Sequence, residues 1–94
     1  MPVLTDKEVQ QRLSELPGWS FRNNSIERQF EFPDFAGAMK FVNDVAEAAE
    51  RVNHHPDIDI RYNKVKMSLT SHDSGGVTAR DLRMAKEITE IATY

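Results

Sequence analysis

Apolar residues recur at helical spacing in three stretches of the chain, and this spacing predicts three helices. The first covers about residues 5–16, begins with a capping box and ends at Pro17. The second follows Pro33 and carries an apolar stripe almost five turns long. The stripe consists of Phe35, Ala38, Met39, Val42, Val45, Ala46, Ala49 and Val52. The third covers about residues 78–93, with Thr78 as its N-cap.

Four shorter stretches alternate apolar and polar residues, which is typical of strands with one buried face. The strands cover about residues 19–22, 25–32, 57–62 and 65–71. Asn23-Asn24 and Asn63-Lys64 are turn signals that join them into two hairpins. Tyr62 falls on the apolar face of its strand, where we expect it to pack in the core.

The predicted order of elements is α-ββ-α-ββ-α, which defines an α+β fold. Hairpins separated by helices favour one four-stranded antiparallel sheet with the three helices on one face. A chain of 94 residues is the size of one small domain, so residues 1–94 are expected to form a single unit. The pattern does not indicate what covers the other face of the sheet.

Composition narrows the class of protein. The chain is 39% hydrophobic and 29% charged, as ordered globular proteins are. Its net charge of −3 argues against direct nucleic-acid binding. With no cysteine, disulfides, thiolate metal ligands and cysteine nucleophiles are excluded. No apolar stretch approaches the roughly 20 residues of a membrane span, and the first residues do not resemble a signal peptide, so we expect a cytoplasmic protein without membrane partners.

The three histidines lie at the ends of predicted elements. His54 and His55 stand where the long helix must end ahead of Pro56, and His72 follows the last strand. If the two hairpins share one sheet, these regions can meet. Imidazole titrates near neutral pH and can serve as acid or base. The same residues also fit plain polar loop positions, and spacing alone does not decide between the two interpretations.

Two acidic residues strengthen the catalytic interpretation. Glu50 precedes His54 by four residues, so both lie on one face if the helix continues, and a carboxylate there orients the imidazole. Asp81 lies on or beside the buried face of the last helix, where an acid needs a partner. An equally good interpretation is that Thr78 and Asp81 form a capping box for that helix.

Other chemistries fit the sequence less well. Adjacent His54 and His55 project in different directions and rarely bind one ion, and no helical His-x-x-x-His pair exists, so no metal site is expected. Ser71 and Ser74 lack the nucleophile-elbow pattern of a hydrolase. Gly75-Gly76 fits a turn better than a phosphate-binding loop.

The candidate residues also form a spaced pattern of seven residues over 32 positions. The pattern consists of Glu50, His54, His55, Pro56, Tyr62, His72 and Asp81. It resembles the signature of the pterin-4a-carbinolamine dehydratase family, and the resemblance covers nearly the whole chain. The resemblance implies loss of water from a 4a-hydroxytetrahydropterin, giving quinonoid dihydropterin and recycling the pterin cofactor of hydroxylases. It implies no metal and no cofactor, because the pterin is the substrate.

Roles follow from the resemblance by position. His54 and His72 are implied as proton-transfer residues, and His55 as a third catalytic position that mainly binds substrate. The family's pterin-contacting segments match Asn53, Thr70, Ser71 and Asp73. Glu50 and Asp81 are implied to orient imidazoles or the pterin. Family members often carry an acid at the position of Asn53, which departs from that pattern.

The resemblance further implies a homodimer formed through sheets or a homotetramer formed through helices. Phe41 and Ala48 lie outside the main stripe of the long helix, and we expect them on a second contact surface. The alternative for Phe41 is packing at the margin of the monomer core. Ile88 and Ile91 offer a similar surface on the last helix. Vertebrate members also serve as dimerisation cofactors of a homeodomain transcription factor, so a non-catalytic binding module or co-activator is the alternative function. The full set of three histidines favours the enzyme.

Overall fold

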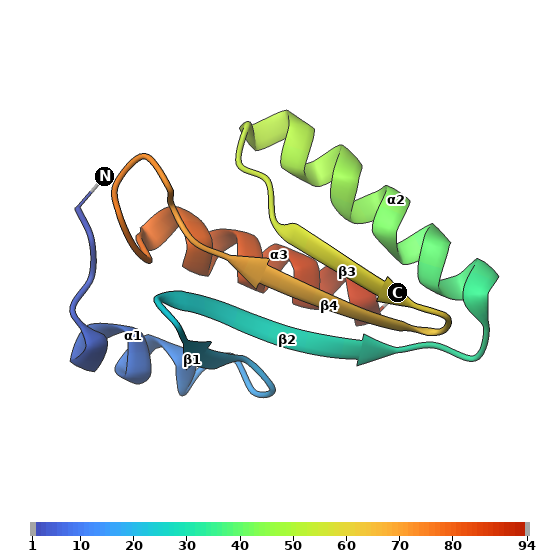
Figure 1. Cartoon of the computed structure of the whole chain (residues 1–94), viewed down its shortest axis with the longest axis horizontal. Coiled ribbons are helices and arrows are strands. Elements are labelled where there is room, and N and C mark those ends of the chain that lie inside the picture. The colour runs from blue at the N-terminus through green and yellow to red at the C-terminus, as the bar shows by residue number, and fades with distance from the viewer. Residues whose placement is uncertain (1, 94) are drawn as a thin grey trace.

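The computed structural model describes residues 2–93 and contains the seven expected elements in the expected order (Figure 1). The elements are α1 (Asp6–Leu13), β1 (Ser20–Arg22), β2 (Ser25–Glu31), α2 (Phe35–Val52), β3 (Asp57–Arg61), β4 (Lys64–Leu69) and α3 (Ala79–Thr93). The strands form one antiparallel sheet in the order β1-β2-β4-β3. The α+β fold predicted from the sequence is confirmed.

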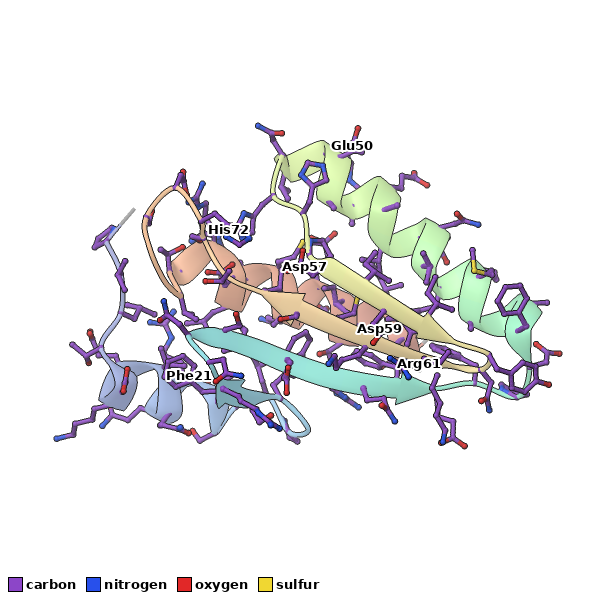
Figure 2. All side chains as sticks on the ribbon, in the orientation of Figure 1. Phe21, Glu50, Asp57, Asp59, Arg61 and His72 are labelled. Atoms are coloured by element: carbon purple, nitrogen blue, oxygen red, sulfur yellow. The ribbon has the colours of Figure 1, made fainter. Side chains whose placement is uncertain are left out.

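Strand register divides the sheet into an apolar and a polar face. Residues paired across strands share a face, and Phe21 pairs with Ile26, Ile26 with Leu69, and Ile58 with Met67. This face packs against the helices and supplies the core, and α3 passes behind β4 in Figure 1. The opposite face carries Glu27, Gln29, Glu31, Asp57, Asp59, Arg61, Lys64, Lys66 and Ser68. Several of these polar residues can be followed along β3 in Figure 2.

The buried face of α2 differs from the predicted one. Phe41 and Ala48, expected on a second contact surface, are core residues with 4% and 0% exposure. The Phe41 ring lies 4.9 Å from that of Phe30, centroid to centroid. Phe35 and Val52, expected in the buried stripe, are half exposed. Both sets of apolar residues have helical spacing, and the helix is rotated so that its aromatic residue at position 41 meets the sheet. Phe41 is therefore a core residue, as is Ile88 of α3 with 0% exposure, so the expectation of an exposed contact surface at these two positions is wrong, whereas Ile91 is partly buried.

Tyr62 is also placed differently from the prediction. It follows the last residue of β3, has a φ of 53°, and is 66% exposed, so the expectation of core packing is wrong. The turn consists of Tyr62 and Asn63 rather than Asn63 and Lys64. The side chain of Asn63 fixes this turn by donating to the carbonyl oxygen of Phe32 at 2.8 Å. The strand consequently ends one residue earlier than its alternation suggested.

The start of α1 follows the prediction. The backbone N–H of Glu8 donates to the Thr5 hydroxyl at 3.1 Å, and the Thr5 N–H donates to Glu8 Oε1 at 2.9 Å. These hydrogen bonds hold the pKa of the Glu8 carboxyl below its ordinary value. None of the helices in residues 2–93 combines the length and apolar character needed to cross a membrane.

Candidate active site

A polar cavity of about 340 Å³ lies where α2 leads into β3 and where β4 leads into α3. It is lined by Asn53, His54, His55, Thr70, His72, Asp73 and Arg80. Figure 2 shows His72 on the loop after β4 and Glu50 near the end of α2, on the same side of the molecule. The structure thus brings all three histidines together from two distant parts of the chain.

The end of α2 determines where the first two histidines point. Asn53 adopts the left-handed conformation, with a φ of 52°, and its N–H donates back to carbonyls of the last helical turn. Asn tolerates this conformation better than most residues, so it stops the helix one residue before His54. Pro56 prevents the helix from resuming. Asn53 therefore has a backbone role in addition to its place at the cavity wall.

Because α2 ends at Asn53, the partner of Glu50 differs from the predicted one. Its Oε2 oxygen contacts Nε2 of His55, not His54 as the continued helix would have placed it. The prediction of a Glu50–His54 pair is wrong because the chain leaves the helix at Asn53. Glu50 and His55 are 76% and 51% exposed, so solvent weakens their interaction.

His54 is instead bound to Asp81 at the start of α3. Its Nε2 nitrogen lies 2.5 Å from Oδ1 of Asp81, whose side chain is fully buried. A carboxylate only accepts hydrogen bonds, so Nε2 must carry the hydrogen. This leaves Nδ1 of His54 as the ring nitrogen available for proton transfer.

The second oxygen of Asp81 belongs to the helix cap. Oδ2 accepts from the Thr78 N–H at 2.8 Å and from the Ser71 hydroxyl at 2.9 Å. One oxygen of Asp81 thus faces the His54 ring, and the other makes the Asp81 half of the cap expected at Thr78. Ser71 is 1% exposed and its hydroxyl also lies 2.8 Å from that of Thr78. Ser71 does not line the cavity, as its predicted contact with the substrate would require, and its hydroxyl instead supports Asp81.

The loop that carries His72 is braced by the β1–β2 turn. The Asn24 side chain donates to the Gly75 carbonyl oxygen at 2.9 Å, and the Thr70 hydroxyl donates to the Asn24 carbonyl oxygen at 2.9 Å. Gly75 has a φ of 86°, in the region that favours glycine. This turn thus holds both ends of the segment around His72, although it is far away in the sequence.

Arg80 is a site residue that the sequence interpretation missed. Its Nη2 donates to Oδ1 of Asp73 at 2.5 Å, and this hydrogen bond is the main reason that the pKa of the Asp73 carboxyl lies below its ordinary value. A cation in the first turn of a helix is disfavoured by the helix dipole. Its position at the start of α3 was therefore a usable signal of a local partner.

No three His, Asp or Glu side chains in residues 2–93 gather closely enough to share an ion. The cavity instead offers imidazoles, one ion pair, an amide and a hydroxyl. These groups can form hydrogen bonds with a polar ligand and exchange protons with it through the histidines.

Fold and site together define a small α+β protein with a histidine-lined cavity at one end of its sheet. The sequence model of the family described as "Pterin 4 alpha carbinolamine dehydratase" matches residues 2–91. A Koribacter versatilis protein named "Putative pterin-4-alpha-carbinolamine dehydratase" is 58% identical over 89 residues, which are 95% of each chain. The chain belongs to the pterin-4-alpha-carbinolamine dehydratase family.

Two solved structures are similar to this chain. A Brucella melitensis protein described as a transcriptional coactivator/pterin dehydratase has a TM-score of 0.92 and 37% identity, covering 96% of this chain and 98% of its own. A pterin dehydratase-like protein described as a RuBisCO assembly factor in the alpha-carboxysome has a TM-score of 0.66 and 17% identity, covering 79% and 86%. The second likeness concerns the fold alone.

Proposed function

We propose that the protein is a dehydratase that converts a 4a-hydroxytetrahydropterin into quinonoid dihydropterin. The observation that carries this proposal is the convergence of His54, His55 and His72 on one polar cavity. In this reaction the C4a–oxygen bond breaks, the N5–H proton leaves, and a C4a–N5 double bond forms. Hydroxide is a poor leaving group, so the reaction needs an acid at the hydroxyl and a base at N5.

His54 and His72 are the proton-transfer pair in this proposal. His54 is held by buried Asp81 through Nε2, which leaves Nδ1 for the substrate. His72 makes no hydrogen bond to another side chain in residues 2–93 and lines the same cavity. One imidazole protonates the departing hydroxyl, which leaves as water, and the other accepts the N5 proton. The two protons balance, so both rings need only exchange protons with solvent to return to their starting state.

His55, Arg80 and Asp73 bind the pterin ring. A pterin offers a carbonyl oxygen and ring nitrogens as acceptors, and an amino group and an amide N–H as donors. The Arg80 guanidinium can donate to the former, and the Asp73 carboxylate can accept from the latter. The volume of about 340 Å³ is adequate for a bicyclic ring with a short substituent.

A second candidate is a non-catalytic binding module or co-activator on the same fold. The Brucella melitensis relative, described as both transcriptional coactivator and pterin dehydratase, keeps this candidate open. Such a module does not require the proton-transfer residues, whereas the dehydratase does.

The test is a direct assay on purified protein with freshly generated 4a-hydroxytetrahydropterin, measured above the uncatalysed rate. His54→Ala and His72→Ala should each lower kcat by roughly 10²–10⁴. Lys66→Ala on the polar sheet face, away from the cavity, is the matched control and should retain full activity. Wild-type protein no faster than the uncatalysed reaction would reject the enzyme in favour of the binding module.

A further inference from the structure

A second cavity of about 310 Å³ lies beside His54, between the end of α2 and α3. It is lined by Val52, His54, Arg80, Arg83, Met84 and Glu87. His54 and Arg80 line both cavities, so the two hollows share a wall made of these side chains. A ligand in the histidine-lined cavity therefore has this second cavity, called the second compartment below, directly beside it.

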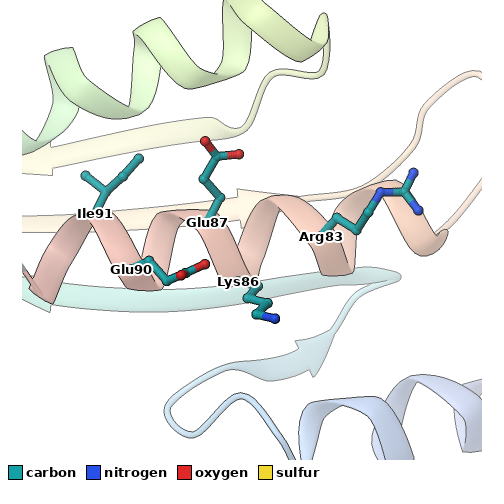
Figure 3. Close-up of a pocket in the computed structure, with 5 residues that line it drawn as sticks. All are labelled: Arg83, Lys86, Glu87, Glu90 and Ile91. Atoms are coloured by element: carbon teal, nitrogen blue, oxygen red, sulfur yellow. The ribbon is translucent and has the colours of Figure 1, made fainter.

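The second compartment combines an apolar wall with one unmatched positive charge. Val52 and Met84 supply the apolar surface. Glu87 Oε1 accepts from the Arg51 side chain at 3.2 Å, so its negative charge has a partner. Arg83 makes no ion pair with any residue in 2–93. Figure 3 shows Arg83 extending toward the N-terminal end of α3, which is the end nearest the histidines. An anionic group in this compartment would have Arg83 as its counter-charge.

The chemistry of the pterin indicates which part of the substrate can enter the second cavity. The reaction proposed above takes place at C4a and N5, and C6 is bonded directly to N5. If His54 exchanges a proton at this centre, the first atom of the C6 substituent lies two bonds from N5. His54 borders both compartments, and of the groups next to the reacting atoms only the C6 substituent extends beyond the ring, so it is the part of the substrate that can reach the second compartment.

We propose that the second cavity is the subsite for the C6 substituent of the pterin, and that Arg83 selects substituents ending in an anionic group such as a phosphate. This inference rests on the proposed function, since it places the pterin ring in the histidine cavity. Arg83 is then a specificity-determining residue, and Val52 and Met84 contact the carbon chain that links the anion to the ring.

Binding of two stable fluorescent pterins tests the inference independently of turnover. 6-Hydroxymethylpterin and its phosphate monoester share the ring and differ only in the anion. The wild-type protein should bind the phosphate ester about 3- to 10-fold more tightly, and rising salt should reduce the difference, as for a partly exposed ion pair. Arg83→Gln should abolish the preference and leave the affinity for 6-hydroxymethylpterin unchanged.

Lys86→Gln is the matched control, because it removes the same charge from the same helix. Lys86 lines two other surface hollows along α3, one of which is drawn in Figure 3, but not the second cavity. It should keep the preference for the phosphate ester. Equal wild-type binding of both pterins, or a preference that survives in Arg83→Gln, would overturn the subsite while leaving the ring site intact. If neither pterin binds, the proposed pterin site itself is wrong, and the subsite with it.

Discussion

The Nε2 atom of His54 lies 2.5 Å from Oδ1 of Asp81, and Asp81 has no solvent-accessible surface. The two residues are 27 positions apart, and they meet because the chain leaves α2 near the start of α3. The contact fixes which imidazole nitrogen faces the carboxylate, and so which one remains for chemistry.

Asp81→Asn should lower kcat by about 10- to 10³-fold with little change in KM. An amide NH₂ turned toward His54 makes Nε2 an acceptor and moves the ring hydrogen to Nδ1, which reverses the tautomer. Nitrogen chemical shifts of the His54 ring should report this reversal. Glu50→Gln, the corresponding change at exposed His55, should alter kcat less than about threefold. An unchanged tautomer in Asp81→Asn would contradict the positioning role.

Ser71→Ala should reduce the free energy of unfolding by about 1–2 kcal/mol, because the buried hydroxyl serves both Asp81 and Thr78. Activity should also fall several-fold as Asp81 loses one of its donors. Ser74→Ala, in the same loop and outside this network, is the control and should be close to neutral. Urea denaturation measures the stability; equal stability of the two variants would show that the buried hydroxyl contributes little.

The Asp73 carboxyl should titrate below the ordinary pKa of about 3.8, because the Arg80 hydrogen bond favours its charged form. The pKa of Asp73 is lower in the folded protein than in the unfolded chain. The Asp73–Arg80 pair therefore stabilises the fold at pH values above the ordinary pKa, and this stabilisation is lost as the pH falls through the lowered pKa. Carbon-detected NMR titration of Asp73 measures this directly. In Arg80→Gln the Asp73 pKa should rise; no rise would mean that Arg80 does not hold the carboxylate in solution.

Phe41→Ala should destabilise the protein by about 3–5 kcal/mol, since it opens a cavity between α2 and the sheet. Phe35→Ala, on the same helix but half exposed, should cost less than about 1 kcal/mol. Guanidinium unfolding of both variants measures the difference. Similar losses for both would mean that α2 presents a different face to the core.

Self-association should occur through β3, which is an edge strand with Ile58 and Ile60 each 37% exposed beside exposed Tyr62. Light scattering at micromolar concentration should give the mass of a dimer or tetramer. Ile60→Lys should shift the protein toward the monomer, whereas Val3→Lys, an equally non-conservative change at another exposed apolar residue, should not. A wild-type mass equal to that of one chain would exclude a stable oligomer.

The element order of this fold could be predicted because period and turn signals are local properties of the sequence. The face of α2 could not, since Ala38, Val45 and Ala49 belong to both possible apolar stripes, and only packing against Phe30 selects the one with Phe41. Tyr62 was misplaced for a similar reason, because strand alternation does not reveal where a turn begins.

In the candidate site, too, some features could be predicted from the sequence and others depend on how the chain folds. The meeting of His54 with the loop of His72 could be expected from two hairpins in one sheet, without any distance information. The partners of the imidazoles could not be predicted because they depend on where α2 ends. Since the left-handed Asn53 ends the helix, Glu50 contacts His55 and not His54. The position of Arg80 in the first helical turn indicated a local partner, but only the folded loop shows that this partner is Asp73.

The two oxygens of Asp81 couple local unfolding at the start of α3 to the orientation of the His54 ring. One of its oxygens receives the amide of Thr78 and so closes the first turn of α3, while the other holds the ring of His54. Fraying of that turn would release the carboxylate and, with it, the orientation of the imidazole. The orientation of His54 and the start of α3 thus depend on the same carboxylate. The hydrogen-exchange rate of a single backbone amide, that of Thr78, reports how often the site is assembled.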